Sequence, residues 1–508
     1  MNRISILGAA ALLAVLPTAV HAQSTPATTS SSQEIIVEKN TTVVVKEAPK
    51  PSPVTFTPYG FLLLNAYFND APFAQKQYPG SPLPCPKAGA ADGCNVGGAF
   101  LLNVRQTRLG SRLAFDDTAG WTGATLSALV EVDFNGGFFA TNPSGYYNSI
   151  LRLRKAYTDA AWGTESKFTL RIGQDDRLVS PLRPVSLAYI ADPLFQQAGL
   201  LHGRAPLLEA RWDLNPKNGL GVSVAAAALT PMETTVAVVG TVKGAPVTAA
   251  APNQNVVINP SPDIPGWNVS PGGAGIDFGS GNRARLPNLE GRIGVSWKSD
   301  GKKIVDLGGW GGWQKNRFYV PVDPAFLTSA GKTLDVDSTI VGGDLTVNLW
   351  FFQALASIYT ARGYEVPGAF ASQGVAFKTG NTAFVPAVAG GAAAHSGSGL
   401  AGTAATGVTA TAVKANGGWF QISARPIEAL QVYGGWGGVD SPFNQILGTT
   451  AAQGGAGRIN NYMWAVGVVG YAGKNWRFSA EYASDKATYA TDATATGAQF
   501  SLNSQLIF

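Results

Sequence analysis

The chain has 508 residues, a formal net charge of +5 and a mean hydropathy of +0.07. Charged residues make up 14% of it, against about 25% in soluble proteins, whereas Gly (61 residues) and aromatic residues (12 Trp, 15 Tyr and 24 Phe) are abundant. These values argue against a bundle of membrane helices and, because no Lys/Arg-rich run is present, against nucleic-acid binding. They favour a closed β-sheet with an apolar outer face and a polar inner face.

Residues 1–22 have the pattern of a cleaved export signal. Arg3 precedes an apolar run, and the sequence "VHA" stands before Gln23, where cleavage is expected. A membrane anchor helix is the alternative, which Pro17 disfavours. Residues 23–53, rich in Ser, Thr and then Pro, are expected to form a flexible tail, and docking of this tail on a partner or on the cell wall stays open.

Two cysteines, Cys85 and Cys94, lie in one segment rich in Pro, Gly and Ala. In an exported protein we expect them to form a disulfide. A metal or redox pair is disfavoured by their spacing and by the absence of a nearby His. We expect no metal site and no cofactor.

From Val54 onward, segments of about 10–14 residues alternate apolar and polar residues with period two. In "GATLSALVEVDF", Leu126 and Val130 share one face, and Glu131 and Asp133 share the other. In "LRLRKAYTDAAW", the alternation puts Arg152 and Arg154 on one face and Leu153 and Tyr157 on the other. About sixteen strands are predicted, at residues 54–68, 102–115, 122–136, 149–162, 167–174, 203–214, 219–230, 286–298, 303–314, 336–348, 350–362, 416–424, 427–440, 460–472, 475–485 and 495–508.

The connections between these strands alternate between short and long. The short ones include "GTES", "NPKN" and "SDGK", and the long ones include residues 231–285 and 364–415. A soluble sandwich has no reason to place every long loop at one end. The pattern therefore predicts an all-β fold over residues 54–508, a transmembrane antiparallel β-barrel whose last strand, "SLNSQLIF", pairs with its first strand.

Several motifs resemble those of a known family. "YGFLLLNAYF", "RQTRLGSRLAF", "ALVEVDF" and "IGQDDRLVSPLRPVSL", together with the terminal Phe508, resemble the trimeric outer-membrane porins of Gram-negative bacteria, in particular the dicarboxylate-type (DcaP-like) group. The resemblance is best over residues 55–215. It implies a homotrimer in the cell outer membrane, in contact with lipid and lipopolysaccharide, with residues 23–53 in the periplasm. It also implies that Phe508 is an assembly signal for the barrel-assembly machinery.

The resemblance further implies that the third long loop folds into the barrel and narrows a water-filled channel for small hydrophilic solutes. Polar faces of the strands would line the same channel. The candidate pore-lining and constriction residues are Arg108, Arg112, Glu131, Asp133, Arg152, Arg154, Arg171, Asp175, Asp176, Arg177, Arg183, Asp192, Glu209 and Arg211.

An excess of arginine on this wall favours anions, small carboxylates among them. The alternative is that Arg and acidic residues on adjacent strands pair and only stiffen the wall.

The motif "GGWGG" occurs twice, at residues 308–312 and 434–438. Because both copies lie late in strands that rise toward the long loops, Trp310 and Trp436 are expected in an aromatic girdle at the outer membrane interface. Stacking on a sugar is the alternative.

Enzymatic activity is not expected. After signal removal the chain has two histidines, His202 and His395, and neither lies near a G-x-S-x-G nucleophile motif. Two other functions stay open: an adhesin or cell-wall tether that uses the long loops and the 23–53 tail, and a barrel hydrolase that uses paired carboxylates such as Asp175 and Asp176.

Overall fold

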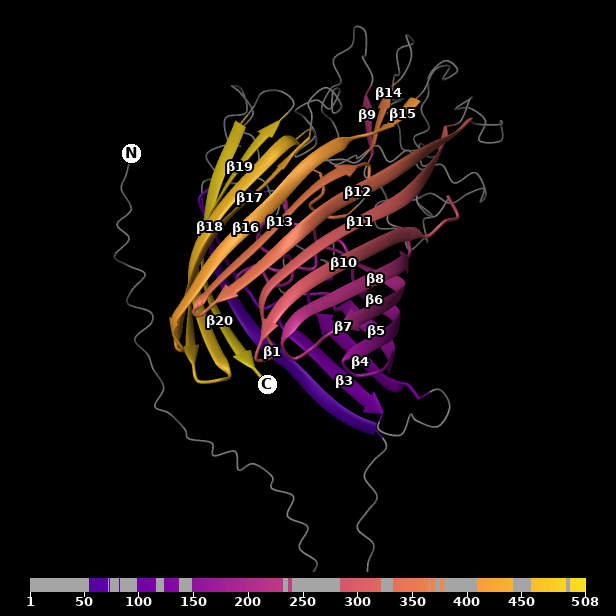
Figure 1. Ribbon diagram of the computed structural model, residues 1–508. Helices are drawn as coiled ribbons and strands as arrows, with labels where there is room; N and C mark the ends of the chain where they lie inside the picture. Colours follow the sequence, from indigo (N-terminus) through magenta and orange to yellow (C-terminus); the bar gives the residue numbers. More distant parts are fainter. Residues whose placement is uncertain are drawn as a thin grey trace, which may run out of the picture. The chain divides into compact units, whose positions relative to one another are not determined.

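The structure is a computed structural model (Figure 1). It describes residues 54–71, 73, 82, 98–115, 123–136, 149–231, 236–239, 284–320, 332–364, 366–370, 375–378, 409–441, 458–489 and 494–508. The predicted export signal, the 23–53 tail and most of the long loops lie outside these residues. Cys85 and Cys94 also lie outside them, and no disulfide is seen in the part that the structure describes.

The described chain is all-β, and most of its strands belong to one sheet. The barrel strands are β1 (Val54–Asn69), β3 (Arg108–Phe115), β4 (Thr125–Asp133), β5 (Arg152–Trp162), β6 (Ser166–Asp176), β7 (Arg204–Leu214), β8 (Gly219–Leu229), β10 (Asn288–Ser299), β11 (Lys302–Val320), β12 (Lys332–Leu349), β13 (Phe352–Arg362), β16 (Lys414–Ile427), β17 (Leu430–Asp440), β18 (Arg458–Ala472), β19 (Trp476–Tyr489) and β20 (Thr494–Ile507). Within the described ranges, no helix is long and apolar enough to cross a membrane.

Each barrel strand pairs antiparallel with its neighbours, and the sheet closes on itself because β1 pairs with β20 from Phe61↔Ile507 to Asn69↔Gln499 (Figure 1). The short strand β2 (Ala99–Asn103) and β3 both pair with β1, so that together they fill one position of the barrel. The predicted closed antiparallel barrel of sixteen strands is therefore confirmed.

Strand pairing also defines the single hairpin turn between β12 and β13. Leu349 pairs with Phe352, and Trp350 between them has a positive φ of 50°, as a two-residue hairpin turn requires. The two strands predicted on either side of Leu349 are confirmed. The structure adds a small sheet that was not predicted, made of β9 (Val236–Val239), β14 (Val375–Lys378) and β15 (Thr409–Ala412).

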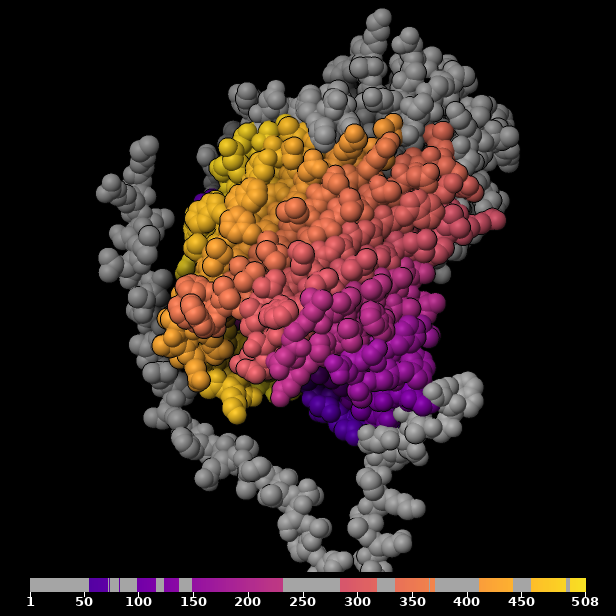
Figure 2. Space-filling model, viewed as in Figure 1, coloured from indigo at the N-terminus to yellow at the C-terminus, as the bar shows by residue number. Residues whose placement is uncertain are grey.

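The barrel is apolar outside and polar inside, the reverse of a soluble protein. On β1, Leu62 is 52% exposed, whereas Asn65, three residues further along the strand, is fully buried. The same alternation holds on β20, where Ser501, Asn503 and Gln505 are buried. In Figure 2 the outward side chains of β10–β13 and β16–β18 cover one side of the barrel continuously. Period-two alternation thus separates the two faces along each strand.

Candidate functional site: the inner segment and the charged wall

The connection between β6 and β7, residues 177–203, is called here the inner segment. Its backbone bonds to inward side chains of strands far apart in the sheet: Asn65 on β1 donates to the Leu187 carbonyl (3.1 Å), and Asn461 on β18 donates to the Gln197 carbonyl (2.8 Å). The segment therefore lies inside the barrel.

Two buried side chains hold the middle of the inner segment. Glu481 on β19 accepts from the backbone N–H groups of Leu187 (2.9 Å) and Ala188 (2.8 Å). Gln106, between β2 and β3, accepts from Ile190 (2.8 Å) and Ala191 (2.7 Å). Because loop backbone inside a barrel has no sheet neighbour, such side chains must supply its hydrogen-bond partners.

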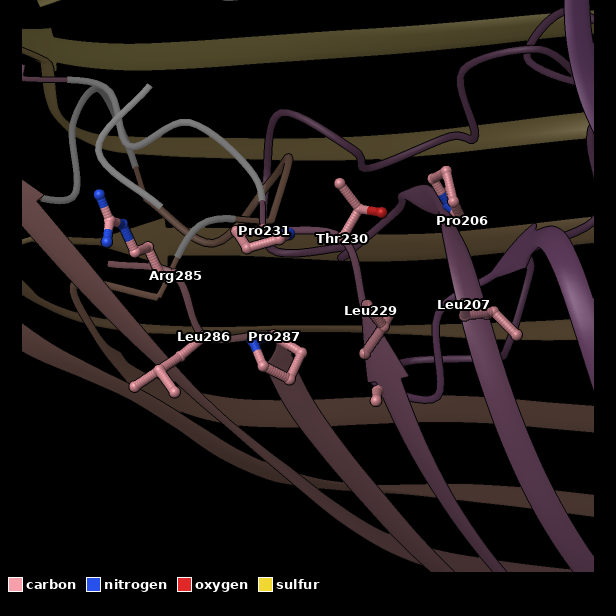
Figure 3. Close-up of a pocket in the computed structure, with 9 residues that line it drawn as sticks. Pro206, Leu207, Leu229, Thr230, Pro231, Arg285, Leu286 and Pro287 are labelled. Carbon is pink, nitrogen blue, oxygen red and sulfur yellow. The ribbon is translucent and has the colours of Figure 1, made fainter. Parts of the chain in front are cut away.

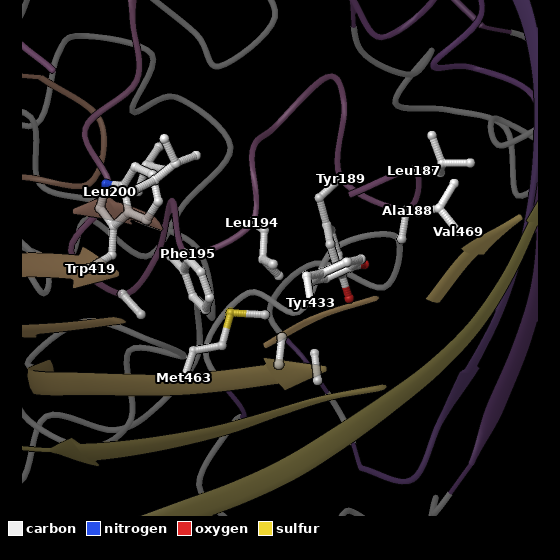
Figure 4. Packing of buried hydrophobic residues seen from close by; sticks show 14 of the residues in the cluster. Leu187, Ala188, Tyr189, Leu194, Phe195, Leu200, Trp419, Tyr433, Met463 and Val469 are labelled. Atoms are coloured by element: carbon white, nitrogen blue, oxygen red, sulfur yellow. The ribbon is translucent and has the colours of Figure 1, made fainter. Parts of the chain in front are cut away.

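An apolar cluster fills the space between the inner segment and strands β16–β18. Figure 4 shows Leu194, Phe195 and Leu200 of the segment facing Trp419 and Met463 of the wall. The Phe195 and Trp419 rings stack with centroids 6.1 Å apart. This side of the barrel interior is therefore packed with side chains like a protein core.

Glycines of the second "GGWGG" motif make room for this packing. A Cβ on Gly437 would lie 2.3 Å from the Ala198 carbonyl oxygen, and a Cβ on Gly435 would lie 3.0 Å from the Phe195 ring. Only glycine lets the two backbones approach this closely.

The tryptophans of the two motifs have different positions. Trp436 is 41% exposed on the outer face and stacks on Tyr462 with centroids 5.8 Å apart, as a girdle residue would. Trp310 is only 3% exposed, and its Nε1 donates to Asp344 (2.9 Å) on the inner face. The predicted girdle position is therefore wrong for Trp310, because the period-two alternation of β11 turns this residue inward.

The charged wall is the set of inward charged residues on β3–β7. At its centre, Arg152 donates to Asp133 through Nε (3.0 Å) and Nη2 (2.7 Å). Arg154 bridges Glu131 (2.8 Å) and Asp133 (2.8 Å). The sequence predicted these four residues on facing polar sides, and the structure joins them in one network.

A β-bulge extends the charged wall to a residue that the sequence analysis missed. The register between β4 and β5 shifts between Glu131 and Val132, so the alternation of β5 reverses after Arg154. Lys155 then reaches both Asp175 (2.7 Å) and Asp176 (2.8 Å). The predicted outward position of Tyr157 is wrong for the same reason, since the Arg171 guanidinium lies 3.9 Å from its ring centroid.

The other predicted wall residues are distributed around this network. Arg171 pairs with Asp159 (2.7 Å) and with Asp175. Arg108 lies 3.5 Å from Glu131, and Arg211 pairs with Glu209 (2.7 Å). Arg112 has no ion pair in the described part of the chain and lies over the Tyr59 ring at 5.2 Å.

The inner segment brings its own charges to the wall. Asp176, at the end of β6, lies 3.8 Å from Arg183 of the segment and 3.8 Å from Arg204 of β7. The side chains of Asp176 and Arg183 are 32% and 29% exposed, so water reaches the space between segment and wall. Asp192 accepts from Asn135 (3.1 Å), and burial raises the pKa of its carboxyl.

His202 ends the segment beside this cluster. Its Nε2 lies 3.1 Å from Arg204, while its Nδ1 is buried without a hydrogen-bond partner. Burial and the nearby positive charges of Arg183 and Arg204 lower the pKa of His202 well below its usual value. The imidazole is therefore neutral near pH 7 and accepts a hydrogen bond from Arg204.

Arg177 does not lie where solute could meet it. It forms a buried ion pair with Glu290 (2.7 Å) and donates to the Tyr364 hydroxyl (2.7 Å). The same carboxylate accepts from the Leu178 backbone N–H (2.8 Å). Burial alone would lower the pKa of Arg177, but the charge of Glu290 outweighs it and raises that pKa. Arg177 thus anchors the start of the inner segment and does not line open space.

One further cavity lies at the long-loop ends of β7, β8 and β10 (Figure 3). It measures about 440 Å³ and is lined mainly by aliphatic and proline side chains, with Arg285 at its edge. It contains none of the predicted site residues. Within the described ranges, no group of three or more His, Cys, Asp or Glu is placed to hold a metal ion.

Comparisons with known proteins bear on the fold. No family model matches the chain, and no curated protein sequence matches it. Among solved structures, the outer membrane channel DcaP of Acinetobacter baumannii is similar, with a TM-score of 0.53 and 12% identity over 90% of this chain and 97% of that chain.

An anion-selective porin from Comamonas acidovorans is matched with a TM-score of 0.43 and 11% identity, over 90% of this chain and 100% of that chain. OmpF of Salmonella typhi is matched with a TM-score of 0.43 and 10% identity, over 89% and 97%. The similarity to DcaP confirms, at the level of fold, the predicted resemblance to outer-membrane porins of the DcaP-like group.

Proposed function

We propose that this protein is an outer-membrane porin, a water-filled channel for passive diffusion of small hydrophilic solutes with a preference for anions. The observation that carries the proposal is the contrast between the two faces of a closed barrel. The outer face is apolar, whereas the inner face has a partly exposed network of charges between Arg183 of the inner segment and the wall of β3–β7. A sheet with these faces suits lipid outside and water inside.

Exposed aromatic residues support a membrane location. Trp297, Trp212 and Phe168 point outward near the short turns, and Trp436 and Trp464 point outward higher on their strands. Amphipathic rings at two levels of a barrel are typical of proteins that contact lipid headgroups. We infer that the outer face contacts outer-membrane lipid and lipopolysaccharide.

The anion preference follows from the charges that line the space between inner segment and wall. The cations there are Arg108, Arg112, Arg152, Arg154, Lys155, Arg171, Arg183 and Arg204, and the acids are Glu131, Asp133, Asp159, Asp175, Asp176 and Asp192. Among the described residues of this space, cations exceed acids by two, and burial raises the pKa of the Asp192 carboxyl. Charges in a narrow, low-dielectric channel act strongly on passing ions.

We further propose an assembly role for Phe508. Its backbone pairs with Gly60 through two hydrogen bonds of 3.1 Å, so the last residue joins the two ends of the sheet. Assembly machinery that recognises this strand would therefore contact the barrel at the point where it closes.

We also propose a homotrimer, which the resemblance to trimeric porins implies. Native mass measurement tests the trimer, and a monomeric mass in mild detergent would contradict it.

A planar bilayer experiment tests the channel. Folded, heat-modifiable protein should give stepwise ohmic conductance, and its reversal potential in a KCl gradient should report anion preference. The double variant Arg152→Ala/Arg154→Ala should shift that potential toward cations, because it removes two positive charges that pair with Glu131 and Asp133. Absence of conductance would refute the channel, and an unchanged potential would mean that these arginines are only structural.

A further inference from the structure

A second cluster of positive charge lies inside the barrel, away from the charged wall. Two guanidinium groups lie near the ring of Tyr471 on β18: that of Arg425 on β16 lies 4.2 Å from the ring centroid, and that of Arg477 on β19 lies 5.5 Å from it. All three residues alternate with the outward residues of their strands and lie near the short turns. They therefore border the barrel interior at its short-turn end.

These two arginines differ from most arginines of the charged wall, which pair with acids. Within the described ranges, neither Arg425 nor Arg477 forms an ion pair. Arg425 donates through Nε (3.1 Å) and Nη2 (2.5 Å) to the Glu428 carbonyl. Its Nη1 donates to no acceptor among the described residues. The Nε of Arg477 is buried without a hydrogen-bond partner.

Neighbouring groups on the same faces do not supply the missing negative charge. The Tyr471 hydroxyl donates to the Gln431 amide oxygen (2.5 Å), and Gln505 pairs across the sheet with Arg477. Both neighbours are neutral amides. An aromatic ring attracts a guanidinium through its quadrupole and fixes its plane, but it leaves the positive charge in place.

We propose that Arg425 and Arg477 form a binding site for a small oxyanion, such as sulfate, phosphate or a carboxylate, at the short-turn end of the barrel interior. Guanidinium groups bind such anions through paired N–H groups. Here two guanidinium groups lie within 5.5 Å of one ring centroid, and Nη1 of Arg425 and Nε of Arg477 have no acceptor among the described residues. Tyr471 is a positioning residue for both. The inference deepens the proposed channel, because it adds an anion site at the short-turn end, outside the constriction.

Sulfate titration by calorimetry, in detergent at fixed ionic strength, tests the site without any need for conductance. Wild type should bind sulfate, and Arg425→Gln/Arg477→Gln should raise the Kd at least tenfold. Tyr471→Leu should raise it severalfold, whereas Tyr471→Phe, which keeps the ring, should not. The matched control is Lys303→Gln, which removes a cation near the same end that already pairs with Asp306 at 2.5 Å; its Kd should match wild type.

Heat-modifiable migration establishes that each variant is folded. An unchanged Kd in the double arginine variant, or no sulfate binding by wild type, would overturn the proposed site. Bilayer currents separate this result from the channel proposal. If wild type conducts no ions, the channel is refuted while the titration still decides the site; if it conducts and the double variant binds sulfate normally, the site alone is refuted.

Discussion

Glu481 is the side chain whose removal should most directly release the inner segment. It is 3% exposed, and its carboxylate accepts from the backbone of Leu187 and Ala188 and from the Ser186 hydroxyl (2.6 Å). Glu481→Ala would leave these three donors without their acceptor inside the barrel. We expect the turn at residues 185–188 to detach more often, because its backbone then gains by bonding to water.

The size of the effect follows from the bonds that are lost. A hydrogen bond to a charged group contributes about 1.5–3 kcal/mol, and three bonds to one carboxylate do not add fully. The free energy of local opening should fall by about 2–4 kcal/mol, which raises the open fraction about 30- to 700-fold. Glu481→Gln keeps one acceptor oxygen without the charge, so its effect should lie between wild type and Glu481→Ala.

Hydrogen exchange measured by mass spectrometry reports this opening directly. Amides of the peptide that contains Leu187–Ala191 should exchange faster in Glu481→Ala, and single-channel records should show added noise. Glu209→Gln is the matched control, since it changes a buried carboxylate that pairs with Arg211 on its own strand. If exchange in this peptide stays at the wild-type rate while the barrel remains folded, the carboxylate does not hold the segment.

Three other outcomes are expected. The pKa of His202 in the folded protein lies below its usual value, so its contribution to stability is present above about pH 6.5. This contribution is lost as the pH falls, because the unfolded chain then takes up the proton. His202→Gln should therefore flatten the pH dependence of heat-modifiability between about pH 6.5 and 5, and a profile identical to wild type would contradict this. Gly437→Ala should lower the unfolding temperature, because its Cβ would lie 2.3 Å from the Ala198 oxygen. Gly434→Ala should be tolerated, because the nearest neighbour of its Cβ would be at 3.5 Å. Equal unfolding temperatures of the two variants would exclude the close approach as the cause. Deletion of Phe508 removes both hydrogen bonds to Gly60 and should reduce the yield of folded barrel in membranes, measured by the gel shift on heating, and a full yield would remove the assembly role.

Strand alternation predicted most of the barrel because each transmembrane strand has a sharp contrast between its faces. It predicted the ends of β11 and β12 less well. These strands were expected at 303–314 and 336–348, but they pair as far as Val320↔Lys332. Beyond residue 314 charged pairs enter the ladder, Lys315 opposite Asp337 and Arg317 opposite Asp335, and Arg317 and Asp335 form an exposed ion pair (2.8 Å). The apolar signal therefore ends before the hydrogen-bonded ladder does.

The candidate site was predictable where it depends on neighbouring strands and not where it depends on the inner segment. Arg152 and Glu131 could be placed together because β4 and β5 are consecutive. Glu481 is separated from Leu187 by 294 positions, and Glu290 from Arg177 by 113, so no local pattern links them. Both strands carry other charged residues, such as Arg477 and Asp485 on β19 and Arg292 on β10, so the sequence does not single out either carboxylate. Lys155 was missed because a bulge, which alternation does not reveal, turns it inward.

The inner segment has two chemically different sides, and this difference decides where solute could pass. Its apolar side packs on β16–β18, where Gly435 and Gly437 remove the side chains that would hold it away. Its charged side, with Arg183, faces Asp176 and the wall of β3–β7. Since a packed core excludes water and a network of partly exposed charges retains it, we expect an aqueous path beside the inner segment to follow its charged side. Selectivity would then depend on how these charges are arranged along one wall more than on the net charge of the chain.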